Sequence, residues 1–549
     1  MAAKERKEPS VTTHLMAAPI GARRIPAAMP RRLCALLRLT CLAVCGSLAL
    51  ALSAAPAQKP NLLFILADDM GVGDVSALNP HAAWKTPHLD RLAREGVAFT
   101  DAHSASGVCT PSRYTLLTGR YSWRSKLKKG VLQGYSPALI EPGRVTIAEF
   151  LRRQGYATAA VGKWHLGLDW ARRGPQPEDV DFTRPVAGGP LAHGFERFFG
   201  ISASLDMPPY VWLRDDRATR VPAGTIGNSP APRLWRGGPI AEDFRMEEVQ
   251  ARLADEGIAF LAQRAAARDG KPFFLYLPFA SPHTPVLPTG EFAGKTKTTP
   301  YGDFCAQLDA DIGRVLAALE RLGLARDTLV IFTADNGFAP PAGLDALKKI
   351  AHDPSAGRRG YKADLFEGGH RVPFLARWPG VAPAGARSGA TIGQLDVFAT
   401  MAEILGAKIP DNTAEDSVSF LAALRGAQDA PRAAPLVNHS ADGEFAIRDG
   451  QWKLLLCPGS GGWSPPTANP TLWLKAERAD LSRLPPFQLY DLAADPAETT
   501  NLAAAHPEIV QRLGRAMRGL IERGRSTPGA PQQNDGGPWP QIAWMEQFK

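Results

Sequence analysis

This sequence of 549 residues has little of several features that mark specialised classes of protein. Cysteine occurs at six positions, and three of them (Cys34, Cys41 and Cys45) lie within the first 57 residues, so the remainder can form at most one disulfide. No internal repeat is present. The formal net charge is +9, but +6 of it falls within residues 1–57, and the rest holds 55 basic against 52 acidic residues. A balance this even gives no basis for nucleic-acid binding.

An apolar run long enough to cross a membrane is also missing. Leu39–Leu52 follows several arginines and precedes Ala55-Pro56-Ala57, a small-residue cleavage pattern. A basic start, a short apolar run and such a pattern are typical of an export signal, whereas a transmembrane helix needs about 20 apolar residues. The basic part is long for a signal, so Met29 is a candidate for the true start. We therefore expect residues 1–57 to be removed and the mature protein to be periplasmic or secreted, without a stable membrane span.

What the sequence does contain is the composition of an ordinary globular protein, with 45% hydrophobic and 21% charged residues. Its length exceeds one typical core, so we expect two domains. Apolar strands and amphipathic helices predict an α/β domain over 58–434. Beyond it, Asp449-Gly450 lies between two apolar segments and predicts a tight hairpin, which a later strand and helix complete to a small α+β subdomain over 435–526. The Pro/Gly-rich tail, 527–549, is expected to pack loosely or to lack order.

Oxygen ligands follow two of the expected strands. The apolar run Pro60–Ala67 leads into Asp68-Asp69, and the strand Thr328–Thr333 leads into Asp335-Asn336, each with glycine close behind. Burying unpaired carboxylates is costly, and at the carboxyl end of a strand in an α/β sheet a binding site is the better interpretation. Only hard oxygen donors are present in this set, which suits Ca²⁺ or Mg²⁺ and argues against zinc.

Two further segments combine ionisable side chains with a constrained backbone. In Gly162-Lys-Trp-His-Leu-Gly167, the side chains of Lys163 and His165 share one face of an extended chain, while Trp164 packs on the other. In Ser281-Pro-His-Thr-Pro285, His283 lies between two prolines in a stiff loop that suits core packing poorly. We interpret both as site segments rather than as structural histidines.

The most specific stretch is Gly107-Val-Cys-Thr-Pro-Ser-Arg-Tyr-Thr-Leu-Leu-Thr-Gly-Arg120. Pro111 is tolerated in the first turn of a helix, which predicts a loop that turns into a helix near Ser112, with Cys109 just ahead of it. The start of a helix carries free N–H groups and a partial positive charge, which suits an anionic ligand. Arg113 adds a permanent planar cation to the same end.

At these residues the chain resembles the type I sulfatases of the alkaline-phosphatase superfamily. The motif Cys-x-Pro-Ser-Arg followed by Leu-Thr-Gly is that family's signature, and residues 109–119 match it throughout. The resemblance implies an α/β, alkaline-phosphatase-like fold, in which helices flank a large mixed sheet and a small antiparallel sheet with a helix follows. It also implies that a separate maturation enzyme oxidises Cys109 to formylglycine, an aldehyde that hydrates to a gem-diol. The family usually holds Ca²⁺, with Mg²⁺ as the alternative.

The resemblance runs from about residue 60 to 523 and implies roles for individual residues. The implied metal ligands are Asp68, Asp69, Asp335, Asn336 and the group formed from Cys109. The implied catalytic residues are Cys109, Arg113, His165 and His283, and the implied sulfate-binding residues are Lys163, Lys362 and Ser204, with Ser202 as the alternative serine. The diol would attack sulfur, His283 with help from Lys362 would protonate the leaving oxygen, and His165 would take the proton that allows sulfate to leave.

The expected function is therefore hydrolysis of sulfate monoesters, on sulfated carbohydrates rather than free aryl sulfates. The insertion 206–240, expected to form surface loops, would shape specificity. A formylglycine-dependent phosphodiesterase or phosphonate monoester hydrolase shares Cys-x-Pro-x-Arg, although the Leu-Thr-Gly continuation and Gly-Lys-Trp-His favour a sulfatase. If Cys109 is unmodified, the chain would be a non-catalytic binder of sulfated glycans. If it is modified, Cys305 and Cys457 could pair, but nothing in the sequence requires a disulfide.

Overall fold

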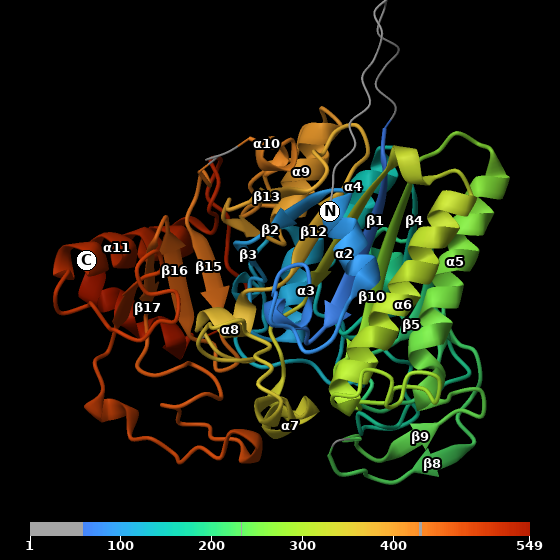
Figure 1. The fold of residues 1–549 in the computed structure, drawn as a ribbon, viewed down its shortest axis with the longest axis horizontal. Coiled ribbons are helices and arrows are strands. Elements are labelled where there is room, and N and C mark those ends of the chain that lie inside the picture. Colours follow the sequence, from blue (N-terminus) through green and yellow to red (C-terminus); the bar gives the residue numbers. More distant parts are fainter. Residues whose placement is uncertain (1–58, 232, 428–430, 538) are drawn as a thin grey trace, which may run out of the picture. The chain divides into compact units, whose positions relative to one another are not determined.

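The computed structural model describes residues 59–231, 233–427, 431–537 and 539–549, and Figure 1 shows its fold. The export signal and the alternative start at Met29 lie outside the described residues. Within them, none of the helices combines the length and apolarity needed to cross a membrane. Residues Lys59–Lys549 form one compact unit, so the division at 434/435 stays a prediction.

A mixed sheet of ten strands forms the centre of this unit. Its middle consists of parallel strands in the order β11, β1, β10, β4, β5, and antiparallel neighbours join both sides through β12 and β6. From one edge to the other the strands are β13 (Ala386–Ser388), β2 (Val97–Phe99), β12 (Phe374–Arg377), β11 (Thr328–Ala334), β1 (Asn61–Asp68), β10 (Phe273–Pro282), β4 (Ala157–Lys163), β5 (Arg197–Ile201), β6 (Leu213–Arg214) and β7 (Arg217–Ala218). The α/β class and the large mixed sheet expected from the sequence are confirmed.

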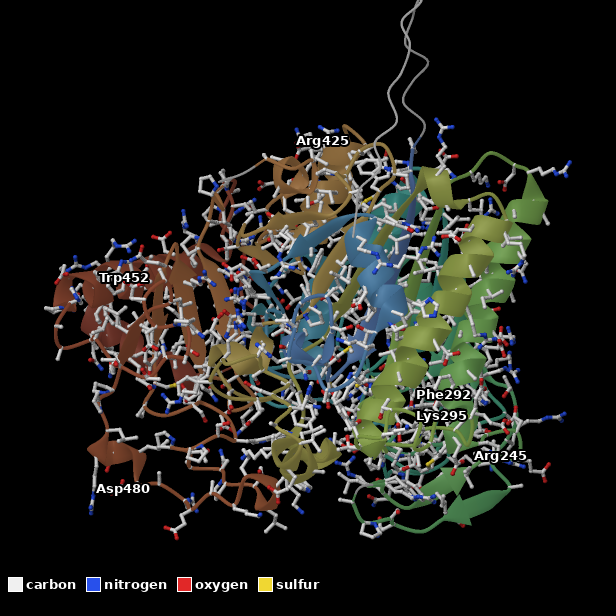
Figure 2. The ribbon with its side chains drawn as sticks, in the orientation of Figure 1. Arg245, Phe292, Lys295, Arg425, Trp452 and Asp480 are labelled. Carbon is white, nitrogen blue, oxygen red and sulfur yellow. The ribbon has the colours of Figure 1, made fainter. Side chains whose placement is uncertain are left out.

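Helices flank this sheet. In Figure 1, α2 (Pro87–Arg94), α5 (Val249–Ala267) and α6 (Pro300–Arg321) lie in front of the strands, and α6 packs against both of the other two. α3 (Cys109–Thr118) instead packs against α4 (Ile147–Arg153) and α9 (Asp396–Ile404). The side chains drawn in Figure 2 fill the space between helices and strands. β1 is buried along its whole length, as its unbroken apolar sequence predicts for a central parallel strand.

The C-terminal part contains the expected small antiparallel sheet. Its strands run in sequence order, β15 (Leu436–His439), β16 (Phe445–Asp449), β17 (Trp452–Leu455) and β18 (Gln488–Asp491). The hairpin between β16 and β17 turns at Asp449-Gly450, with Gly450 in a left-handed conformation (φ 60°) that glycine adopts without strain. Helix α11 (Pro507–Arg523) packs on β16 and β17.

Two expectations need correction, and the question of a disulfide, which the sequence left open, is answered. The tail does not pack loosely, because Trp544 and Phe548, in the 3₁₀ segment η9 (Pro540–Phe548), are buried in an apolar cluster with α11. The insertion 206–240 is not all surface loop, because it contributes the strands β6 and β7, adds the short strands β8 (Gly224–Ile226) and β9 (Gly238–Ile240), and buries Trp212 against Phe199, at 4.9 Å between ring centroids. Cys305 and Cys457 are both buried free thiols rather than a disulfide.

Candidate active site

The carboxyl ends of two adjacent parallel strands bring the expected oxygen ligands together. β1 and β11 pair in register along their length, so their ends, at Asp68 and just before Asp335, lie side by side. Asp69 has a left-handed backbone (φ 62°), and its N–H donates to Asp335 Oδ1 at 3.1 Å. Asn336 Nδ2 donates to Asp69 Oδ1 at 2.7 Å. All four side chains are therefore collected at one edge of the sheet, and all are buried.

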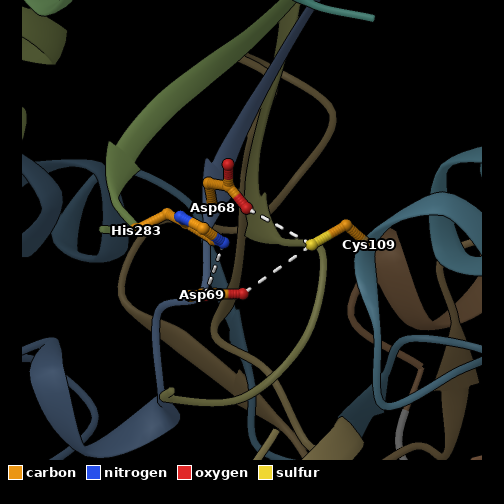
Figure 3. Close-up of side chains that lie close together, drawn as sticks. All are labelled: Asp68, Asp69, Cys109 and His283. Carbon is orange, nitrogen blue, oxygen red and sulfur yellow. Dashed lines mark hydrogen bonds and ion pairs between the residues drawn. The ribbon is translucent and has the colours of Figure 1, made fainter. Parts of the chain in front are cut away.

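Cys109 faces this group of oxygens. Its Sγ lies 3.7 Å from Asp68 Oδ1 and 3.9 Å from Asp69 Oδ1 (Figure 3), and Lys362 Nζ lies 3.5 Å from the same sulfur and 2.8 Å from Asp69 Oδ2. Helix α3 begins at Cys109 itself, which corrects the expected start near Ser112. The first turn accommodates this because its N–H groups have no partner within the helix. The thiol is thus fixed by the helix start rather than by a loop.

Arg113 lies one turn further along α3 and connects the helix to both strand ends. Its Nε and Nη2 donate to Asp335 Oδ2 at 3.0 and 2.7 Å, and its Nη1 donates to the Lys163 carbonyl at 2.9 Å. Nη2 also lies 3.6 Å from Asp68 Oδ1. The guanidinium is completely buried, so these contacts define its position.

Lys163, Ser204 and His283 complete the site beside the two aspartates. Lys163 Nζ donates to Asp68 Oδ2 at 2.6 Å and to Ser204 Oγ at 3.0 Å. His283 Nε2 lies 3.3 Å from Ser204 Oγ and 3.3 Å from Asp69 Oδ2, and Figure 3 shows the imidazole beside the two aspartates. The structure therefore brings Ser204 into the site, whereas Ser202 Oγ is buried without a hydrogen-bond partner among the described residues.

His165 reaches the site by a different route from the one expected. Its backbone is left-handed (φ 56°) rather than extended, so the simple alternation of Lys163 and His165 along a strand does not apply. His165 Nε2 lies 2.8 Å from the Leu132 carbonyl, which assigns the proton to Nε2. Nδ1 is buried with no hydrogen-bond partner within the described ranges. Burial, with Lys163 and Arg113 nearby, holds the pKa of His165 well below its usual value, so Nδ1 of the neutral ring carries a lone pair that can accept a proton.

The charges of the site balance one another. Burial raises the pKa of Asp68, but Lys163 and His283 outweigh it, and the net pKa lies below the usual value. Burial also raises the pKa of Asp69, but His283 and Lys362 lower it by more, so the net pKa again lies below the usual value. Both carboxylates are therefore ionised at neutral pH despite complete burial.

The Cys109 side chain behaves differently. Burial raises the pKa of the Cys109 thiol, against the opposing effect of Lys163 and Lys362. An unmodified Cys109 is therefore a neutral thiol at neutral pH, and the thiolate is the nucleophilic form of cysteine.

The donor set fits a hard divalent cation. Asn336 Nδ2 is oriented by Asp69 Oδ1 and by the Gly337 carbonyl at 2.9 Å, while Asn336 Oδ1 is buried and has no hydrogen-bond partner in the described part of the chain. An orphaned amide oxygen beside three carboxylates is the arrangement that Ca²⁺ or Mg²⁺ would satisfy. The possible ligand atoms of Asp68, Asp69, Cys109 and His283 all lie within 4.8 Å of one another.

A second group of possible metal ligands, His103, Glu367 and His370, has a structural explanation. Lys453 Nζ donates to Glu367 Oε1 at 3.0 Å, and Arg371 Nη1 donates to Glu367 Oε2 at 2.9 Å. A cation bound here would have to displace a lysine and an arginine. We interpret this group as a buried ion-pair network.

One supporting layer was missed by sequence reasoning. Beneath the Asp69 turn, Asp74 Oδ2 accepts from Tyr301 Oη at 2.7 Å and from the Gly71 N–H at 2.8 Å, and Asp74 Oδ1 lies 2.9 Å from His352 Nε2. These contacts fix the turn that carries Asp69. Only Asp74, close behind the Asp-Asp pair, could have been suspected, because Tyr301 and His352 come from distant segments with no motif of their own.

The residues gathered at the start of α3 and at the ends of β1 and β11 agree with the result of a comparison with known protein families. A sequence model of the family described as Sulfatase matches residues 60–407. The chain belongs to the sulfatase family. Sulfatases are sulfuric ester hydrolases, so the expected enzyme class is confirmed along with the family.

Individual sulfatases align with nearly the whole chain. The N-acetylgalactosamine-6-O-sulfatase of Bacteroides thetaiotaomicron is 33% identical over 505 residues, which cover 85% of this chain and 94% of the relative. Human arylsulfatase A is 35% identical over 477 residues, covering 85% and 88%. A solved structure from work on the metabolism of multiple glycosaminoglycans by Bacteroides thetaiotaomicron has a TM-score of 0.72 at 32% identity, and the match covers 84% of this chain and 99% of that one.

Proposed function

We propose that this sulfatase hydrolyses sulfate monoesters on carbohydrates, with a formylglycine formed from Cys109 and a divalent cation, Ca²⁺ in preference to Mg²⁺. The observation that carries the proposal is that Cys109 lies beside buried oxygen ligands and close to buried lysine and arginine side chains. Sulfated amino sugars are the proposed substrate class, supported by the name of the bacterial relative. The export pattern supports a periplasmic or secreted protein, and the motif around Cys109 supports a maturation enzyme as its partner.

Asp68, Asp69, Asp335 and Asn336 would hold the cation, together with the group at position 109. When bound, a divalent cation supplies Lewis-acid stabilisation of negative charge on the sulfate group. A hydrated formylglycine would supply two hydroxyls on one carbon, one to act as the nucleophile towards sulfur and one whose deprotonation would release sulfate. Neither a thiol nor a serine hydroxyl offers that second group.

The chain's own cations bind and orient the sulfate group. Lys163 and Lys362 approach the same site, and Ser204 Oγ lies between Lys163 and His283. Hydrogen bonds to charged groups are stronger than neutral ones, and buried donors need no rearrangement when charge develops on the sulfate oxygens. Arg113 adds a positive charge whose position is fixed, because its guanidinium donates to Asp335 and to a backbone carbonyl.

Two histidines are available to move protons. His283 and Lys362 are each 7% exposed, more than the other site residues, which suits His283 as a donor to the leaving-group oxygen of a substrate that enters from outside. His165 is neutral and presents Nδ1 without a partner in the described residues, which suits a proton acceptor. The two rings are held by different backbone segments, so one can give and the other take a proton in the same turnover.

The experiment compares reaction classes on one preparation of the mature, cation-loaded protein. Hydrolysis of para-nitrophenyl sulfate at a far higher kcat/KM than a phosphate diester or a phosphonate monoester is the expected result. The reverse order would replace the proposal by the phosphodiesterase or phosphonate monoester hydrolase alternative. No hydrolysis of any ester by a protein with an intact Cys109 thiol would favour a non-catalytic binder.

A further inference from the structure

Arg236 is an exposed arginine whose position is fixed by an almost buried carboxylate. Its Nη1 donates to Asp206 Oδ2 at 2.8 Å, its backbone N–H donates to the Asp206 carbonyl at 3.0 Å, and its own carbonyl accepts from Tyr210 Oη at 2.6 Å. The Arg236 side chain is 53% exposed, whereas the Asp206 side chain is only 10% exposed. Most surface arginines move freely, but this one is tied at both its backbone and its guanidinium.

The residues that hold Arg236 continue directly from the sulfate-binding region. Asp206 follows Ser204 by two residues, and two residues of chain span at most about 7 Å. Ser204 Oγ in turn lies 3.0 Å from Lys163 Nζ. The arginine therefore lies at the outer end of a short, buried segment whose inner end is in the site.

The chain just after Asp206 packs closely against two other segments, those that contain Gly134 and Gly238. A Cβ placed on Gly134 would come within 1.9 Å of the Pro208 carbonyl oxygen, and a Cβ on Gly238 within 2.3 Å of Pro208 Cβ. Gly238 begins β9, which with β8 forms the hairpin seen beyond the lower end of the sheet in Figure 1. Glycine at both positions allows this close contact, so the β8–β9 hairpin, whose connecting segment carries Arg236, is packed onto the loop that follows Ser204.

The guanidinium has donors to spare. Among the described residues, Asp206 is the one side chain that hydrogen-bonds the Arg236 guanidinium, and it engages only Nη1. Asp206 Oδ1 is buried with no partner in the same ranges, so the aspartate is used to hold the arginine rather than shared within a network. A planar cation with unused N–H groups is suited to bind a carboxylate or a sulfate through two hydrogen bonds.

We propose that Arg236 binds a second anionic group of the substrate, a carboxylate or a further sulfate on the sugar unit next to the scissile ester. The inference rests on the proposed function, because the second anion matters only when the first occupies the sulfate pocket. The contact with Arg236 makes the enzyme selective for sugars with two negative groups over sugars with one. The insertion 206–240 thus contributes a charged contact in addition to its shape.

Inhibition constants against para-nitrophenyl sulfate hydrolysis by the mature, cation-loaded protein test this without requiring turnover of each sugar. One pair of competitors is a monosulfated disaccharide with a uronate carboxylate and its carboxyl-reduced form. The other pair is a disulfated and a monosulfated neutral disaccharide. We expect the more highly charged member of at least one pair to bind about tenfold or more tightly, as for a hydrogen bond to a charged group, and the responding pair identifies the anion.

Arg236→Gln should bring that ratio close to one, and Arg236→Lys should keep part of it because it retains the charge. Arg245→Gln is the matched control: Arg245, labelled in Figure 2, is also exposed, but its Nη1 donates to the Glu242 carbonyl of its own turn at 2.6 Å. Its ratio and rate should equal those of the wild type. Equal binding within both pairs by the wild type, or a ratio that survives Arg236→Gln, would overturn the inference. Absence of any sulfate ester hydrolysis would instead overturn the proposed function, and the inference with it.

Discussion

Replacing Arg113 by methionine tests how the buried charges at the centre of the site are balanced. The variant keeps most of the aliphatic volume but removes a guanidinium that donates twice to Asp335 Oδ2 and once to the Lys163 carbonyl. Removing one partner of a completely buried, hydrogen-bonded ion pair costs about 3–5 kcal/mol, because the remaining charge is left uncompensated. We expect Arg113→Met to lower the free energy of unfolding by that amount in the presence of a chelator.

Arg124→Met supplies the matched control. Arg124 is also completely buried, and its Nε and Nη2 donate to Asp416 at 2.9 Å each. Both substitutions remove a buried guanidinium that donates twice to one carboxylate and through Nη1 to a backbone carbonyl, although Arg124 Nη1 also donates to Asn534 Oδ1 at 2.9 Å. The losses in chelator should therefore be similar. The two substitutions differ in that the Arg113 partner, Asp335, belongs to the proposed cation site.

Calcium should distinguish the two variants. Arg113 lies 2.7 Å from Asp335 Oδ2 and 3.6 Å from Asp68 Oδ1, where its charge repels a cation bound to those oxygens. A cation at about 100 times its Kd stabilises the folded state by about 2.7 kcal/mol, and we expect the gain for Arg113→Met to exceed the wild-type gain by about 1 kcal/mol or more. The gain for Arg124→Met should equal that of the wild type.

The measurement is urea-induced unfolding followed by circular dichroism, with chelator or with calcium, at one pH. If Arg113→Met were as stable as the wild type in chelator, the guanidinium would not be compensating buried charge. If calcium stabilised both variants equally, the carboxylates around Arg113 would not be the cation site.

Three further substitutions have direct readouts. Cys109→Ser should accumulate a sulfate ester at position 109, detected as a mass increase of the intact protein, and multiple turnover at the wild-type rate would remove the mechanism. Ser204→Ala should raise KM for a sulfate ester by about tenfold, because a hydroxyl between Lys163 and His283 is lost, and an unchanged KM would take Ser204 out of the site. Because the pKa of His165 is held below its ordinary value, the unfolded chain gains a proton that the folded chain does not, so the free energy of unfolding falls as the pH drops from about 7 to 5. His165→Gln should flatten this fall by up to about 1.4 kcal/mol per pH unit in urea titrations, and an unchanged slope would mean that the imidazole is charged in the folded state.

The central strands and the residues at their ends could be predicted because their signals are local. An apolar run such as Pro60–Ala67 favours a central strand, and the carboxylates that follow it are costly to bury without partners. Side-by-side placement of Asp68 and Asp335 then follows from parallel pairing of two such strands. Helix α11 also has local signals at both ends, because proline is favoured in the first turn of a helix and glycine just past its end, here Pro507 and Gly524.

Other features depend on long-range contacts that no local pattern encodes. The left-handed conformation of His165 allows its ring to reach the Leu132 carbonyl, and nothing in Gly-Lys-Trp-His indicates it. The polar, Pro/Gly-rich tail suggested disorder, yet its Asp535 accepts from the buried Arg120 at 2.9 Å, and Trp544 completes an apolar cluster. In both cases the partner lies far away in sequence, so the local sequence pattern gave the wrong expectation.

The most direct measurement of the central claim is the mass of the peptide that contains Cys109, taken from mature protein that hydrolyses a sulfate ester. The account predicts loss of the sulfur, a mass that fits formylglycine, and a carbonyl that reacts with a hydrazide. An intact Cys109 thiol in protein that turns over sulfate esters at its full rate would contradict it.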